Sequence, residues 1–422
     1  MPAESGNRNA PRWVVVADDL TGACDTGIQF VRKGFRAVVS VLSGEITRGP
    51  ADTGVWVVDT ESRNAEAAEA ASRLSRLGEA LRPLVGRSVF YKKVDSTLRG
   101  NIGAETRALR EALGLEKVFF QPAFPKIGRT TVNGELLLNG VPVHLTDIGK
   151  DPLKPVTTSS LRDIFYVFCG LCGDDARLAD VCLWSDARTE GELRDAAGEI
   201  LKTRRPEDVL WTGSAGLALA LTELLPPPPP ERDSPERTAA GPAPAGSLLG
   251  FVGSFHPRNA GQIERARRER GVEVCAPDIR EVVENPLAAA EKVSREIGKS
   301  IEAGRDLLVA TALTPRQREE KERLGAEAPD KVSAFLALVC GETVRRNTKV
   351  GGLYLTGGEV AARIFSTLGA GEIIPLREVE PGIPLLRLND GAFKGPVVTK
   401  AGAFGSDGCV GLILDALRGG RG

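Results

Sequence analysis

The chain has 422 residues, more than one compact core usually holds and enough for two domains. Hydrophobic residues make up 42% and charged residues 26%, a balance typical of a globular protein and not of a disordered one. Lysine and arginine number 55 against 56 acidic residues, so the composition provides no general attraction to nucleic acid or to an anionic membrane. A small molecule is therefore the expected partner.

No segment reaches the roughly 20 apolar residues of a membrane helix, and residues 1–12 lack the apolar stretch of a signal peptide, so we expect a cytoplasmic protein. Seven cysteines, an odd number scattered through hydrophobic segments, are expected to be reduced. Cys169 and Cys172 form a C-x-x-C pair, but no second pair follows at zinc spacing. The pair is therefore interpreted as packing residues, not as a metal or redox site.

In the first half of the chain, short β-branched runs alternate with helical patterns. Strands are predicted at 13–17, 55–58, 89–91 and 118–120, and helices at about 22–33, 64–82 and 101–113. Strand, helix, strand in that order favours a mainly parallel sheet flanked by helices.

A proline-rich segment, residues 226–247, has almost nothing to bury and favours an extended conformation. The alternation resumes after it, with strands predicted at 248–252, 307–310 and 353–356 and helices near 257–269, 284–303 and 330–347. The sequence thus predicts two α/β domains, residues 1–225 and 248–422, joined by a linker at 226–247.

The first predicted strand ends in Asp18 and Asp19, just before a helix, where open α/β sheets bind their ligands. One interpretation is that one of these acids only caps the helix. The other is that the two divide the work, with Asp19 receiving a proton from a substrate hydroxyl or binding hydroxyl groups.

Other strand ends carry charge as well. Arg63, in a polar run after the second predicted strand, presents a planar fork of donors suited to a carboxylate. The segment from Lys92 to Asn101 gathers cations, an acid, hydroxyls and a glycine in one turn, which suits an anionic, hydroxylated ligand, although a solvated loop with a salt bridge would look similar. Arg129 lies in a proline-containing loop that is predicted to close over the same site.

The second half has three glycine-bearing turns after strands, beginning at Gly253, Gly357 and Gly402. Backbone N–H groups at such helix starts can bind phosphate, so together the turns predict a nucleotide site. Neither G-x-x-x-x-G-K-[ST] nor G-x-G-x-x-G occurs, which excludes a P-loop and a dinucleotide fingerprint by motif.

From about residue 12 to residue 418 the chain resembles the four-carbon acid sugar kinase family, whose members phosphorylate threonate, erythronate or 3-oxo-tetronate at O4 with ATP. The first half carries the resemblance in ADDLTGACDTG, VVDTESR, KKVDSTLRGNIGAE, PAFPKIGRTTVNG, the TD and DP of TDIGKDP, and TGSAGLA. The second half continues it in VGSF, YLTGGEVAARI, EVEPGIPL and VVTKAGAFG.

The resemblance implies an N-terminal domain that holds the sugar acid and a C-terminal domain that holds ATP. It implies Mg2+ as well, for which the sequence shows no metal motif. The expected substrate-binding residues are Asp19, Arg63, Lys93, Val94, Asp95, Ser96, Thr97 and Arg129. The expected ATP-binding residues are Ser254, Thr356, Gly357, Gly358, Glu359, Gly402, Phe404 and Gly405.

Our mechanistic hypothesis has Arg63 fixing the substrate carboxylate and Asp19 orienting or deprotonating the terminal hydroxyl. Lys93 or Arg99 would meet the developing charge of the phosphoryl group. These assignments make Asp19, Lys93 and Arg99 the expected catalytic residues.

Two departures from the family pattern fall on the ATP side, Phe255 to Asn259 after VGS and Ala403 within GAFG. They leave open a divergent member acting on another hydroxy acid. A non-catalytic sensor of sugar acids is a further alternative, and a nicotinamide-dependent oxidoreductase is disfavoured by the missing fingerprint. The stereochemistry of the substrate and self-association into a homo-oligomer stay open.

Overall fold

The computed structural model describes residues 12–41, 53–151, 154–169, 181–227, 245–254, 256–325, 327–402 and 404–420. The chain divides into two compact units, Met1–Pro229 and Pro230–Gly422, which we call the N-terminal and the C-terminal unit. Most of the predicted linker lies outside the described residues, as do Cys172, Phe255 and Ala403.

The N-terminal unit is built on a parallel sheet in the order β2-β3-β1-β4-β10-β5-β9. Its strands are β1 (Trp13–Ala17), β2 (Ala37–Val41), β3 (Val55–Asp59), β4 (Val89–Lys93), β5 (Lys117–Gln121), β9 (Cys182–Trp184) and β10 (Val209–Gly213). Its helices are α1 (Leu20–Arg32), α2 (Ala67–Leu81), α3 (Ile102–Leu113), α4 (Leu161–Cys169), α6 (Glu190–Leu201) and α7 (Ala215–Leu224).

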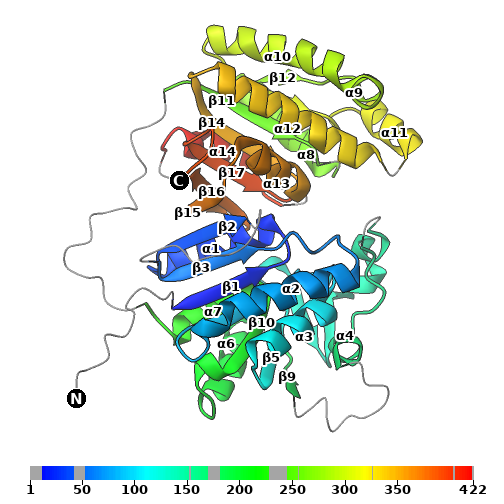
Figure 1. The fold of residues 1–422 in the computed structure, drawn as a ribbon. Helices are drawn as coiled ribbons and strands as arrows, with labels where there is room; N and C mark the ends of the chain where they lie inside the picture. The colour runs from blue at the N-terminus through cyan, green and yellow to red at the C-terminus, as the bar shows by residue number, and fades with distance from the viewer. Residues whose placement is uncertain are drawn as a thin grey trace, which may run out of the picture. The chain divides into compact units, whose positions relative to one another are not determined.

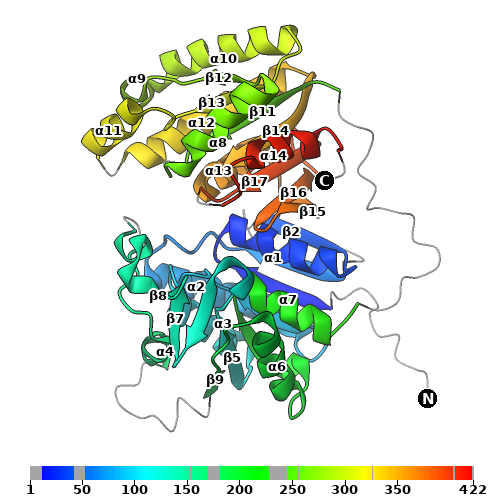
Figure 2. The same ribbon diagram turned by 180° about the vertical axis from the view of Figure 1, so that it is seen from behind.

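The central strands β1, β3, β4 and β10 are buried along their whole length, as expected of a parallel sheet covered on both faces. Helices α2, α3 and α4 pack together on one face, and α1, α7 and α6 on the other (Figures 1 and 2). Helix α3 ends at Gly114, whose φ of 74° gives the left-handed cap that glycine adopts without strain. A small antiparallel sheet, β6 (Arg129–Val132), β7 (Glu135–Leu138) and β8 (Val141–Pro142), follows β5.

The C-terminal unit has a mixed sheet in the order β12-β13-β11-β14-β17-β16-β15, in which β16 runs antiparallel to both of its neighbours, β17 and β15. Its strands are β11 (Ser247–Val252), β12 (Glu273–Cys275), β13 (Leu307–Ala310), β14 (Val350–Thr356), β15 (Glu372–Glu380), β16 (Ile383–Leu388) and β17 (Pro396–Lys400). Its helices are α8 (Arg258–Arg270), α9 (Ile279–Glu284), α10 (Pro286–Glu302), α11 (Pro315–Leu324), α12 (Ala328–Arg346), α13 (Gly358–Leu368) and α14 (Cys409–Leu417). Helices α8 and α14 pack on one face, and α9, α10, α12 and α13 on the other (Figures 1 and 2).

The predicted fold class, α/β with mainly parallel sheets flanked by helices, is confirmed. Each strand predicted in the first half is present. Strands β2, β9 and β10 of the same sheet were not predicted, and β10 lies between β4 and β5.

Among the described residues, no helix is long and apolar enough to cross a membrane. The described cysteines Cys24, Cys182, Cys275, Cys340 and Cys409 are free thiols and buried, as expected of packing residues.

A buried ion pair lies beneath the N-terminal unit's sheet edge. The Nζ atom of Lys92 lies 2.8 Å from Oε2 of Glu105 on α3, and the two side chains are 0% and 1% exposed. Lys92 also donates to the carbonyl of Lys93 at 3.0 Å. A buried charge is tolerated only when it is paired, so this contact links α3 to the end of β4.

Replacing Lys92 with methionine is expected to lower the free energy of unfolding of the N-terminal unit by about 3–5 kcal/mol, because it leaves Glu105 buried without its partner. All four tryptophans, at positions 13, 56, 184 and 211, lie in this unit, so urea denaturation followed by tryptophan fluorescence measures the effect. The double variant Lys92→Met/Glu105→Leu should recover most of the loss. A single variant as stable as the wild type would contradict the importance of the pair.

Candidate functional site

The sheet register of the N-terminal unit brings several polar strand ends together. Ala17 of β1 lies beside Asp59 of β3 on one side and beside Lys93 of β4 on the other. Because these strands are parallel, the residues that follow them emerge at one edge of the sheet. The predicted residues Asp19, Arg63 and Lys93 therefore share this edge.

Arg63 is held by two neighbouring carboxylates. Its Nε and Nη2 atoms donate to Asp18 at 2.9 Å each, and its Nη1 and Nη2 atoms donate to Asp19 at 2.7 and 2.6 Å. Its Nη2 atom also lies 3.8 Å from Asp95. Most of the guanidinium donors thus have partners within the protein, so the hypothesis that Arg63 clamps a substrate carboxylate would require exchange of these contacts.

The two adjacent aspartates have different surroundings. Asp18 is 2% exposed; burial raises the pKa of its carboxyl, but the positive charges of Arg63, Lys92 and Lys93 outweigh it and lower that pKa overall. Asp19 caps α1 by accepting the N–H of Gly22 at 2.9 Å, and its side chain keeps 18% exposure. Asp19 therefore performs the capping role, and both of its oxygens also accept from Arg63. A ligand hydroxyl would meet this partly exposed carboxylate by sharing or replacing these contacts.

Lys93 lies against the same helix start. Its Nζ atom donates to the carbonyl of Val94 at 2.8 Å. A Cβ atom on Gly22 would come within 2.6 Å of an Asp19 oxygen and 2.8 Å of Lys93 Nζ. Only a residue without a side chain leaves room for both charged groups, so Gly22 is part of the site's geometry.

Asp95 organises the turn after β4. It accepts hydrogen bonds from the Thr97 hydroxyl, from Arg99 Nε at 2.9 Å and from Arg99 Nη2 at 3.1 Å. Burial raises the pKa of Asp95, but Arg99 and Arg63 bring it well below its ordinary value. Arg99 also approaches Asp151 at 3.4 Å and remains 30% exposed, so it is a cation that can face a ligand.

The remaining predicted residues of this edge differ in what they can offer. The side chain of Val94 belongs to the hydrophobic core, and Thr97 is buried with its hydroxyl on Asp95, whereas Ser96 is half-buried. Arg129 starts β6 and donates to the carbonyl of Ile127. Burial lowers the pKa of the Arg129 guanidinium.

Sequence reasoning assigned no role to Asp59, the last residue of β3. It is fully buried and accepts the N–H of Glu61 at 3.1 Å. Burial and the neighbouring Glu61 carboxylate raise the pKa of Asp59 well above its ordinary value. Glu61 itself has a φ of 45°, an uncommon conformation for a residue other than glycine and one often found at functional sites.

The C-terminal unit also gathers its predicted residues at one sheet edge. Val252 pairs with Thr356, and Thr356 pairs with Lys400, so the turns after β11, β14 and β17 are neighbours. The N–H of Gly357 donates to the carbonyl of Lys400 at 3.0 Å. A Cβ atom on Gly402 would come within 2.0 Å of Ser254 Oγ, so these two turns touch.

The predicted residues Gly358 and Glu359 begin α13, whose N-cap residue Gly357 has a φ of 103° and provides no side-chain cap. The carboxylate of Glu359 accepts from Ser333 Oγ at 3.0 Å and lies 3.6 Å from Arg363. The side chain of Glu359 is thus committed within the unit, and its backbone N–H is the group to offer a phosphate.

Phe404 and Gly405 complete the turn after β17. Phe404 packs against the core of the unit, and Gly405 has a φ of 90°, with Cys409 Sγ 2.7 Å from the Cβ position. Both residues therefore shape the turn. The residue that sequence reasoning missed is Lys400, whose buried ammonium lies beneath this turn.

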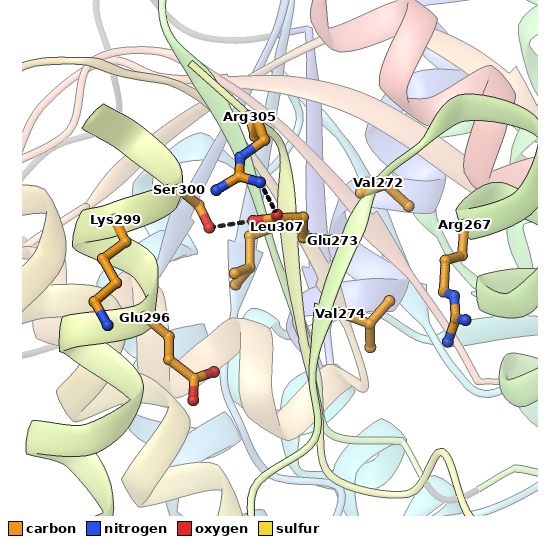
Figure 3. Close-up of a pocket in the computed structure, with 9 residues that line it drawn as sticks. All are labelled: Arg267, Val272, Glu273, Val274, Glu296, Lys299, Ser300, Arg305 and Leu307. Atoms are coloured by element: carbon orange, nitrogen blue, oxygen red, sulfur yellow. Dashed lines mark hydrogen bonds and ion pairs between the residues drawn. The ribbon is translucent and has the colours of Figure 1, made fainter. Parts of the chain in front are cut away.

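A cavity of about 480 Å³ in the C-terminal unit lies away from this edge, beside the amino ends of β12 and β13 (Figure 3). Figure 3 shows Glu273 facing Ser300 and Arg305, which it contacts at 2.5 and 2.6 Å. The carboxylate of Glu273 thus has partners within the protein, and none of the predicted site residues lines the cavity.

Within the part of the chain that the structure describes, no group of three or more His, Cys, Asp or Glu side chains is arranged to hold a metal ion. The side chains described at the two edges thus form no metal cage.

Comparison with known proteins agrees with this two-part organisation. Residues 13–167 match a sugar-binding N-terminal domain model, and residues 249–409 match a nucleotide-binding C-terminal domain model. A D-threonate kinase of Salmonella typhimurium is 32% identical over 96% of this chain and 97% of its own length. A D-erythronate kinase of Heliobacterium modesticaldum is 29% identical over 96% of each chain.

The chain belongs to the four-carbon acid sugar kinase family. The fold agrees with that membership. A crystal structure from Salmonella typhimurium LT2, provisionally described as a tRNA synthase, superposes with a TM-score of 0.77 over 97% of this chain and 99% of that chain, at 22% sequence identity.

The network around Asp95 predicts a specific dependence of stability on pH. Its folded-state pKa lies below the unfolded value of about 3.9, so its contribution is complete above that pH and is lost as the pH falls through the folded pKa. At neutral pH, Asp95→Asn should therefore lower the free energy of unfolding of the N-terminal unit by about 2 kcal/mol or more. The difference from the wild type should shrink below about pH 4.

Urea denaturation at several pH values, followed by tryptophan fluorescence, tests this prediction. Asp195→Asn, a change at a largely exposed acid of α6, is the control and should alter stability little at any pH. A difference between Asp95→Asn and wild type that stays constant down to pH 2 would show that the Asp95 charge is not the cause.

Proposed function

We propose that the chain is an ATP-dependent kinase that phosphorylates the terminal (O4) hydroxyl of a four-carbon acid sugar such as threonate, erythronate or 3-oxo-tetronate. The observation that carries the proposal is the gathering of Asp19, Arg63, Lys93 and Arg99 at one sheet edge, in a chain whose halves match sugar-binding and nucleotide-binding domain models. This edge offers both anionic and cationic groups, as a substrate with hydroxyls and a carboxylate requires.

The acid sugar would bind at the edge of the N-terminal unit. The partly exposed Asp19 would accept the hydrogen bond of the terminal hydroxyl, while Asp18, almost completely buried, would hold Arg63 in place. Arg99 is the cation better placed to meet the substrate carboxylate, because its side chain is 30% exposed and that of Arg63 only 14%. This assignment revises our hypothesis about Arg63 and makes it a positioning residue. Arg129 stays a predicted substrate-binding residue.

In the reaction, the O4 oxygen forms a bond to the γ-phosphorus of ATP while the bond from that phosphorus to the β,γ-bridging oxygen breaks. The hydroxyl proton passes to Asp19, and ADP leaves. Little covalent chemistry is asked of the protein in such a transfer, which depends mainly on alignment and on charge stabilisation. Lys93, beside Asp19 at the start of α1, is the cation expected to stabilise the transferring phosphoryl group.

ATP would bind at the edge of the C-terminal unit. Ser254, the start of α13 and Gly402 present a hydroxyl and backbone N–H groups where turns from three strands meet. No side chain caps the N-terminus of α13, and the positive end of this helix dipole would favour the negative charge of the phosphates.

Mg2+ is part of the proposal as a companion of ATP. Because the described side chains form no metal cage, the ion would be held mainly by phosphate oxygens and water, as is common for Mg2+. It would supply neutralisation of the phosphate charge.

The first test is ATP consumption by the purified protein with Mg2+, across threonate, erythronate, their 3-oxo forms and longer sugar acids. We expect one four-carbon acid to give strong turnover that chelation with EDTA abolishes and excess Mg2+ restores. Silence across the panel with measurable ATP binding would favour another acid substrate. Silence without ATP binding would favour a sensor and contradict the kinase.

Replacing Asp19 with asparagine separates its two roles. Asparagine caps helices about as well as aspartate, so α1 should remain capped, whereas the proton acceptor is lost. We expect kcat to fall by about 100-fold or more with little change in KM for ATP. Turnover near the wild-type level on the responding acid would remove Asp19 from the chemistry; Asp195→Asn serves as the control.

A further inference from the structure

The buried face of α8 carries two amides that bind the backbone of two different turns. Asn259 and Gln262 are 3% and 1% exposed. The Nδ2 atom of Asn259 donates to the carbonyls of Ser254 and His256 at 3.4 and 3.3 Å, both in the turn after β11. The Nε2 atom of Gln262 lies 3.0–3.2 Å from three carbonyls of the turn after β17, those of Phe404, Gly405 and Ser406.

Lys400, at the end of β17, contacts one of these amides and one of the carbonyls that the other binds, that of Phe404. Its ammonium is buried and donates to Asn259 Oδ1 at 2.8 Å. It also lies within 3.3 Å of three carbonyl oxygens, those of Ala401, Gly402 and Phe404. No carboxylate pairs with this ammonium among its described hydrogen-bond partners, which are all neutral oxygens.

These three side chains fix the direction of the peptide groups in both turns. In a trans peptide the carbonyl and the N–H point in opposite directions, so drawing the carbonyls of Ala401 and Phe404 toward Lys400 turns the N–H groups of Gly402 and Gly405 away from it. A Cβ atom on Gly402 would come within 2.0 Å of Ser254 Oγ, so the turn after β11 lies beside Gly402. N–H groups directed away from the buried cation suit an anion.

We propose that Lys400, Asn259 and Gln262 are positioning residues that hold Ser254 and His256 after β11, and Gly402, Phe404 and Gly405 after β17, in the conformation that receives the phosphates of the nucleotide. The inference rests on the proposed function, because it concerns the same nucleotide site. It goes further in assigning the affinity for nucleotide to a buried cation that need not touch the ligand.

The charge of Lys400 provides a way to test this role. Burial lowers the pKa of Lys400 to about 8. The charged or titratable groups that face it are Cys409 of α14, Arg258 of α8 and Glu380 of β15. Burial raises the pKa of Cys409 to about 11, so this thiol stays neutral where Lys400 titrates. Glu380 is engaged by the N–H and hydroxyl of Ser406 at 2.8 and 2.6 Å.

As the pH rises, the affinity for nucleotide should fall, whereas the contribution of Lys400 to the free energy of unfolding should rise. The folded-state pKa of Lys400 lies below the unfolded value of about 10.4, so between these values the unfolded chain binds more protons. The contribution of Lys400 to the free energy of unfolding therefore rises with pH across this window. A neutral amine holds three carbonyls less firmly, so nucleotide affinity should fall across the same window, and unfolding caused by Lys400 cannot explain that fall.

The experiment is calorimetric titration of the full chain with ADP and Mg2+ at pH values from about 7 to about 9.5. For the wild type we expect the affinity to fall by about tenfold, centred near pH 8. Lys400→Met should bind weakly at every pH and show no such transition. Asn259→Asp places a carboxylate beside the ammonium, which raises its pKa, so the fall should move to higher pH. The control, Lys394→Met, changes an exposed lysine of the same unit and should behave as wild type.

The outcomes separate this inference from the proposed function. If the wild type does not bind ADP at any pH, the proposed function fails and the inference fails with it. If the wild type binds ADP but Lys400→Met keeps the same affinity and pH profile, the inference is overturned and the kinase proposal stands. If Lys400→Met does not fold, the Asn259→Asp profile decides, because an unchanged midpoint overturns the role of Lys400.

Discussion

The contact between Arg63 and three aspartates is the interaction on which the N-terminal edge depends. Two adjacent acids, Asp18 and Asp19, emerge from one strand end, and their mutual repulsion would be costly with so little water nearby. The Arg63 guanidinium binds both carboxylates, because its planar set of N–H donors can form hydrogen bonds to two carboxylates at once. It also approaches Asp95, so the turns after β1, β3 and β4 are tied at one point.

The backbone around this guanidinium adapts to it. Gly100 has a φ of 95°, and a Cβ atom there would come within 3.2 Å of Arg63 Cγ and 3.3 Å of Asp18 Oδ2. Leu98, in the same turn, has a φ of 65°, which is uncommon for a residue with a branched side chain. At the C-terminal edge a cation also binds several oxygens, but there the buried Lys400 donates to neutral carbonyls instead of carboxylates. In both units a cation thus binds several oxygens at the edge of the sheet.

Much of this arrangement could be predicted from sequence because parallel strands obey a simple rule. The buried runs at β1, β3 and β4 are short and β-branched, and whatever follows them must emerge at one edge, so Asp19, Arg63 and Lys93 could be grouped without coordinates. The position of β10 could not be inferred, since chain order does not specify the order of strands in a sheet.

The sequence also does not show which groups an individual side chain contacts. Arg63 was predicted to bind a ligand carboxylate, and nothing in the local sequence shows that its donors also meet acids 44 and 45 positions away. The sequence assigned no role to Lys400, whose shortest hydrogen bond joins it to Asn259, 141 positions away. Such contacts depend on angstrom-scale packing, which the periodicity of the sequence does not encode.

The cavity shown in Figure 3 has a consequence for how the protein behaves at high concentration. Strand β12, three residues long, ends the order of described strands in its sheet, so its outer side carries backbone groups that could pair with a strand of another molecule. Glu273 and Arg305 form an ion pair at the start of this strand. Glu296 and Lys299, both on α10, line the same cavity. A short edge strand with charged side chains at its start is a poor template for the addition of a strand from another molecule.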